Sequence, residues 1–125
     1  MTHLYLIRHA QADGLKSGVT GSINPDSGLS LPGIAQAEHL RDRLASSGEI
    51  KADVLISSTL NRARETAEII APALNLPVIL NDKVQELNIG DLEGLTVAEI
   101  EERFGLFSLD HEPFRRLSGL GSDYA

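Results

Sequence analysis

The sequence contains neither cysteine nor tryptophan, and aromatic residues make up only 4% of its 125 positions. Without cysteine, disulfide bonds, thiolate nucleophiles and cysteine-based metal sites are all excluded. No apolar run is long enough to span a bilayer, and the first residues have neither the charged head nor the apolar stretch of a signal peptide. We therefore expect a cytoplasmic protein without membrane contact, whose single domain, residues 1–125, is stabilised by packing of its core.

Positive charge is also scarce, because the 18 acidic residues outnumber the 11 lysines and arginines and the net charge is -7. Binding of a nucleic-acid backbone needs a basic face that displaces counterions, so nucleic acid is not an expected partner. A small phosphorylated substrate or inorganic phosphate is compatible with this charge if a few arginines converge in one cleft. The four histidines lack the spacing of metal ligands, and we expect neither a metal nor another cofactor.

Short apolar runs alternate with helical patterns along most of the chain. Segments 3–8, 54–56 and 77–80 are each predicted to form a short buried strand. Ser30 and Gly48 are suited to begin and end a first helix between them. A second helix, which Ser57 to Thr59 are expected to cap, has its apolar stripe at Leu60, Ala63, Ala67, Ile70 and Leu74. This order predicts an α/β fold of three layers, α/β/α, in which helices cover both faces of a mostly parallel sheet.

The last third of the chain has one clear helix signal. Thr96 and Glu99 form the pattern of a capping box, and Leu95 and Ile100 occupy the positions of a hydrophobic staple, so a third helix is expected to begin there. The glycine- and serine-containing tail, residues 118–125, has little to bury and is expected to be poorly ordered.

Four side chains are predicted to meet at one edge of the sheet. Arg8 and His9 follow the first predicted strand, and open α/β sheets bind ligands at the carboxyl ends of their strands. The second strand leads into the first turn of a helix that carries Arg62, where the helix N-terminus also attracts anions. Glu86 approaches the same edge from the loop after the third strand.

These residue types suit phosphoryl transfer. The planar fork of arginine binds two phosphate oxygens and keeps its charge, a neutral imidazole attacks phosphorus, and a carboxylic acid protonates the leaving group. Each residue taken singly also has an ordinary interpretation: a surface Arg-His pair, a solvated helix face around Arg62, and an exposed loop acid at Glu86. Only their joint placement favours a functional site.

Four motifs follow one another along the chain. Leu-Ile-Arg-His at 6–9 precedes Gly-Leu-Ser-Leu-Pro-Gly with Gln-Ala at 28–37, Ser-Ser-Thr-Leu-Asn-Arg-Ala with Glu-Thr-Ala at 57–67, and Glu-Leu-Asn-Ile-Gly-Asp-Leu-Glu-Gly at 86–94. Together they resemble the histidine phosphatase superfamily in its phosphoglycerate-mutase-like branch (branch 1), with Ala10 in place of the glycine of the opening motif. The resemblance covers almost the whole chain and implies a phosphoglycerate-mutase-like fold.

The resemblance also implies roles for the four residues. His9 would be the nucleophile that forms a phosphohistidine, Arg8 and Arg62 would bind phosphate, and Glu86 would be the proton donor. Three residues stand near positions that contact the substrate in the family: Gln11, Gly21 and Ser22. The implied enzyme is a metal-independent phosphatase, a phosphoric monoester hydrolase, that acts on a small phosphorylated metabolite.

One departure from the family pattern concerns its second catalytic histidine, which lies in a Ser-His-Gly stretch on a later strand. None of His3, His39 and His111 has this context, so we expect a fold that is incomplete at the C-terminus and a weak turnover. The alternatives are a non-catalytic phosphate-binding remnant or interaction module, a fragment of an enzyme, and a phosphoglycerate mutase-type phosphotransferase in the full-length form. The open edges of an incomplete sheet would favour a homodimer.

Overall fold

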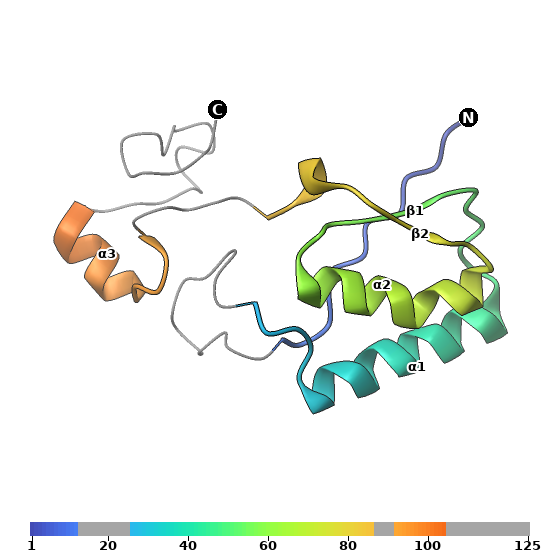
Figure 1. Ribbon diagram of the computed structural model, residues 1–125, viewed down its shortest axis with the longest axis horizontal. Coiled ribbons are helices and arrows are strands. Elements are labelled where there is room, and N and C mark those ends of the chain that lie inside the picture. The colour runs from blue at the N-terminus through green and yellow to red at the C-terminus, as the bar shows by residue number, and fades with distance from the viewer. Residues whose placement is uncertain (13–25, 87–91, 105–125) are drawn as a thin grey trace. The chain divides into compact units, whose positions relative to one another are not determined.

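The computed structural model describes residues 1–12, 26–86 and 92–104, and Figure 1 shows their helices and strands. They belong to two units, one that contains residues 1–12 and 26–85 and another that contains residues 86 and 92–104. Within these residues, no helix has both the length and the apolar character needed to cross a membrane. The predicted tail, 118–125, lies outside the described residues.

Helix α1, Leu31–Ser47, begins and ends at the residues that the sequence predicts. The hydroxyl oxygen of Ser30 accepts a hydrogen bond from the backbone N–H of Gly33 at 3.1 Å and so satisfies a free donor of the first turn. At the other end Gly48 adopts a left-handed conformation with φ 59°, and its N–H donates to the carbonyl of Leu44. Both caps of the first predicted helix are thus confirmed.

Helix α2, Asn61–Leu74, lies alongside α1 (Figure 1). The buried apolar side chains of this pair are small or aliphatic: Ala37 and Leu44 from α1, and Ala67 and Ile70 from α2. Because small side chains allow two helices to approach closely, this apolar seam forms the core of the first unit. Of the predicted apolar stripe, Leu60, Ala67 and Ile70 are buried, and Ala63 and Leu74 are partly buried.

Strands β1, Leu55–Ser57, and β2, Val78–Leu80, pair in parallel, with Leu55 opposite Val78 and Ser57 opposite Leu80. A short 3₁₀ helix, Asp82–Val84, follows β2. The first unit is therefore a mixed α/β structure with a small parallel sheet. Two of the three predicted strands are confirmed.

The predicted strand at 3–8 is not formed. Its residues pair with neither β1 nor β2, and Leu4 and Leu6 are 81% and 87% exposed. An apolar run becomes a strand only when another strand accepts its hydrogen bonds, and neither described strand pairs with this segment. The burial of the other two strands is also lower than predicted, since Ile56 and Ile79 are each about half exposed.

In Figure 1 both α1 and α2 lie on the same side of the two strands, so two of the three predicted layers are present in the first unit.

In the second unit, α3, Val97–Phe104, begins with the predicted capping box. The Glu99 carboxylate accepts from the backbone N–H of Thr96 at 2.8 Å, and the Thr96 hydroxyl accepts in return from the N–H of Glu99 at 3.2 Å. The bond from the Thr96 backbone lowers the pKa of the Glu99 carboxyl, because it favours the charged form.

Candidate functional site

His9 is partly buried and both of its ring nitrogens have a hydrogen-bond partner. Nδ1 lies 2.7 Å from the carbonyl oxygen of Ala10, and Nε2 lies 3.2 Å from Nε of Arg62. A carbonyl can only accept and a guanidinium can only donate, so the hydrogen of the neutral ring is on Nδ1 and the lone pair is on Nε2. The ring is therefore held in the tautomer in which Nε2 is the nucleophilic atom.

Arg62 reaches His9 from the first turn of α2. Its side chain is 3% exposed, and its Nη1 lies 3.8 Å from a carboxylate oxygen of Asp26. A guanidinium removed from water in this way needs a negative or strongly polar partner, because an isolated buried charge is very costly. The Asp26 carboxylate is such a partner and is itself only 8% exposed.

The first turn of α2 is not capped as the sequence suggests. Its N-cap residue is Leu60, which has no side-chain oxygen, and the hydroxyl of Ser58 accepts from the N–H of Leu60, one position too early to cap the helix. The N–H of Arg62 donates instead to Asp26 at 3.2 Å, across 36 residues of sequence. The cap therefore comes from a distant loop, which local sequence patterns do not reveal.

Thr66 connects the two sides of the site. Its buried hydroxyl accepts from the backbone N–H of Ala10 at 3.1 Å and donates to the carbonyl of Arg62 at 2.8 Å. One side chain thus fixes the peptide that follows His9 against the turn that carries Arg62. Thr66 lies within the third sequence motif, but sequence reasoning assigned it no role.

Gln11 contributes through its backbone. Its carbonyl accepts from the N–H and the hydroxyl of Ser30 at 3.0 and 3.2 Å, and its N–H donates to the side chain of Gln36 at 2.9 Å. The chain passes so close to α1 here that a Cβ on Gly33 would come within 3.0 Å of the Gln11 carbonyl. These contacts fasten the residues after His9 to the start of α1.

Replacing Gly33 by alanine is therefore expected to destabilise the protein. The added Cβ meets a backbone atom that cannot move without breaking the bonds of Ser30 to Gln11, and we expect the free energy of unfolding to fall by roughly 3 kcal/mol. Gly48→Ala is the control, because nothing lies within 4 Å of its Cβ and only the strain of its positive φ, about 1 kcal/mol, is added. Urea unfolding of the two variants measures the difference, and an equal loss in both would contradict the close approach.

The contacts described around His9 and Arg62 do not include the other predicted site residues. Arg8 directly precedes His9 and is exposed, and Glu86 is exposed and belongs to the second unit. Gly21 and Ser22 lie outside the described residues. Over residues 1–12, 26–86 and 92–104, no three histidine, aspartate or glutamate side chains gather as metal ligands.

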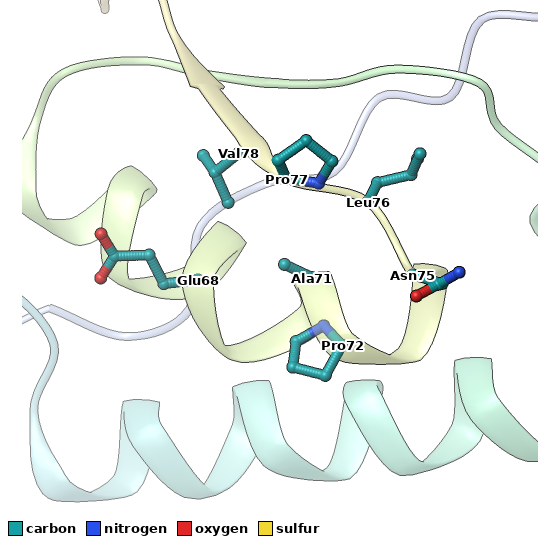
Figure 2. Close-up of a pocket in the computed structure, with 7 residues that line it drawn as sticks. All are labelled: Glu68, Ala71, Pro72, Asn75, Leu76, Pro77 and Val78. Atoms are coloured by element: carbon teal, nitrogen blue, oxygen red, sulfur yellow. The ribbon is translucent and has the colours of Figure 1, made fainter.

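A shallow hollow of about 580 Å³ lies elsewhere, at the C-terminal end of α2. Figure 2 shows the residues that line it: Glu68, Ala71, Pro72, Asn75, Leu76, Pro77 and Val78. Arg62 lies in the first turn of the same helix, so the hollow is not part of the site around His9.

An imidazole nitrogen that presents its lone pair beside a buried guanidinium is an arrangement whose chemistry suits an anion such as a phosphoryl group. The family model described as histidine phosphatase superfamily (branch 1) matches residues 4–117. The chain belongs to this superfamily.

Relatives with described activities include phosphatases and mutases. A probable phosphatase from Schizosaccharomyces pombe is 36% identical over 113 residues, which are 86% of this chain and 50% of the relative. A 2,3-bisphosphoglycerate-dependent phosphoglycerate mutase from Methylobacterium is 38% identical over 82% of this chain and 50% of its own. The structure of a mycobacterial glucosyl-3-phosphoglycerate phosphatase has a TM-score of 0.64 and 29% identity, and the match covers 77% of this chain and 43% of that one. The chain thus spans about half the length of the curated relatives it matches.

Proposed function

We propose that His9 forms a phosphohistidine and that the protein is a metal-independent phosphatase of a small phosphorylated metabolite. The observation that carries this proposal is the position of the Arg62 guanidinium, 3.2 Å from the Nε2 lone pair of His9. A phosphoryl group bound by this guanidinium would lie next to the atom that attacks it, and such proximity is a large part of phosphoryl-transfer catalysis. Family membership supports the same chemistry.

The proposed reaction has two steps. Nε2 of His9 attacks phosphorus, the bond from phosphorus to the substrate oxygen breaks, and a carboxylic acid protonates that oxygen. Water then attacks the phosphohistidine, its proton passes to the same carboxylate, and phosphate leaves. The family resemblance alone assigns this carboxyl group to Glu86. Arg8 and Arg62 hold the equatorial oxygens, and the Arg62 bond to Nε2 must break as phosphorus approaches. The Ala10 carbonyl accepts from Nδ1–H and so stabilises the positive charge that develops on the ring.

The complete domain is proposed to have the three layers predicted from sequence. In it, residues 3–8 would form a strand and further helices would cover the second face of the sheet. The exposure of Leu4, Leu6, Ile56 and Ile79 supports this proposal, because apolar side chains of this size are normally covered in a finished core.

Phosphoglycerate mutase activity is the second candidate, because relatives such as the Methylobacterium mutase match the chain as well as the phosphatases do. Both candidates share the phosphohistidine and differ in the acceptor of the second step, which is water in one and a substrate hydroxyl in the other.

The test of the proposal is to incubate the chain with an aryl phosphate in the absence of added metal, quench it in alkali, and map phosphate to individual peptides. Phosphate on the peptide that contains His9, and not on those with His39 or His111, is the expected result. A chain that binds inorganic phosphate but forms no phosphoprotein and releases no phenol would instead be a non-catalytic phosphate-binding domain.

A further inference from the structure

The carboxylate of Asp26 contacts the same residue, Arg62, at two points. One oxygen accepts from the backbone N–H of Arg62 at 3.2 Å and from the N–H of Gly28 at 3.4 Å. The other lies 3.8 Å from Nη1 of the Arg62 guanidinium. The Asp26 side chain is 8% exposed and that of Arg62 is 3% exposed, so both charges are largely removed from water.

This two-point contact restricts how the guanidinium can lie. The side chain of arginine has several rotatable bonds, so a contact at its far end in addition to one at its backbone reduces the directions in which the guanidinium can lie. With Nη1 drawn toward Asp26, the Nε–H of Arg62 points to Nε2 of His9 at 3.2 Å. Because the bonds of the two ring nitrogens set where the hydrogen of a neutral imidazole lies, this donor and the Ala10 carbonyl, which lies 2.7 Å from Nδ1, together keep the hydrogen of His9 on Nδ1.

We propose that Asp26 is a positioning residue that aims Arg62 at His9 and thereby keeps Nε2 of His9 free of hydrogen. Asp26 itself touches neither the nucleophile nor the phosphoryl group. The proposal rests on the proposed function only because it takes His9 and Arg62 as the reacting groups. The effect of Asp26 on the tautomer of His9 can be measured without any turnover.

The segment that holds Asp26 is anchored by other bonds as well. The side chain of Asn61 donates to the Asp26 carbonyl at 3.0 Å, and the Glu65 carboxylate accepts from the N–H of Leu29 at 2.6 Å. These bonds do not involve the Asp26 carboxylate. Glu65→Gln is therefore a matched control that removes one negative charge from the same loop contact without touching Arg62 or His9.

The experiment compares the wild-type chain, Asp26→Asn and Glu65→Gln. Long-range ¹⁵N–¹H NMR spectra of the His9 ring, recorded where the ring is neutral, report which nitrogen carries hydrogen. We expect hydrogen on Nδ1 in the wild type and in Glu65→Gln. In Asp26→Asn the Ala10 carbonyl still accepts from Nδ1–H but the Arg62 donor is displaced, so we expect a measurably larger population with hydrogen on Nε2. The rate of phosphoprotein formation should fall about a hundredfold in Asp26→Asn, as for other misplaced reacting groups.

The outcomes distinguish the positioning role of Asp26 from the proposed phosphatase function. If wild-type His9 carries its hydrogen on Nε2, the positioning role is wrong, whether or not Asp26→Asn folds. If Asp26→Asn keeps both the wild-type tautomer and the wild-type rate, or if Glu65→Gln changes the tautomer as much, the role is also wrong, while the phosphatase function is unaffected. If the tautomer changes only in Asp26→Asn but the wild type forms no phosphoprotein, the positioning role holds and the proposed function fails.

Discussion

Replacing His9 by asparagine is expected to abolish the phosphoprotein and to reduce turnover of an aryl phosphate by at least about a thousandfold, as for other lost nucleophiles. The Asp26 carboxylate stays beside Arg62 in this variant, so the buried guanidinium keeps a charged partner. The asparagine side chain is too short to reach the place of Nε2 and has no nitrogen lone pair basic enough to attack phosphorus. Rapid-quench labelling together with steady-state release of phenol measures both effects.

The matched control is His39→Asn, which makes the same chemical change away from the site. His39 is exposed on α1. This variant should form the phosphoprotein and hydrolyse the aryl phosphate as the wild type does. Full labelling of the His9 variant would show that phosphate is attached elsewhere, and the assigned nucleophile would then be wrong.

Replacing Arg62 by lysine is expected to weaken binding of inorganic phosphate and to slow phosphoprotein formation, each by about a hundredfold. The positive charge beside Asp26 is kept, so the lysine variant avoids leaving that carboxylate alone in a buried position. What is lost is the planar fork and the Nε–H that reaches His9. Isothermal titration with phosphate and quench labelling report the two effects separately.

Arg64 supplies the control for this change, since it lies on the same helix and pairs at 3.7 Å with Glu68 on the surface. Arg64→Lys should bind phosphate as the wild type does. Equal losses in the two variants would indicate that α2 attracts phosphate by its overall charge, and Arg62 would then have no special role.

The helices were predictable because their signals are local. Ser30 and Gly48 lie beside the backbone groups that they satisfy, and the Thr96–Glu99 box spans a single turn. The strand predicted at 3–8 failed because strand formation depends on a partner, and apolar spacing along one segment carries no information about whether a sheet edge is available to it.

The same distinction applies to the site. His9 and Arg62 were chosen from sequence because their side-chain chemistry suits phosphate and because each follows an apolar run that ends in polar residues. Asp26 and Thr66 were not predicted as residues of the site. Their roles arise from bonds that cross 36 and 56 residues of chain.

By itself, the sequence determined both ends of α1, the start of α3, the presence of two short strands, the family, and the two residue types that suit a phosphoryl group. Only the tertiary structure decided which nitrogen of His9 holds the lone pair, which carboxylate accompanies Arg62, and that the first apolar segment pairs with neither of the described strands. The physical reason is range: caps and amphipathic stripes act within a few residues, whereas tautomers, buried ion pairs and sheet edges depend on groups that only folding brings together.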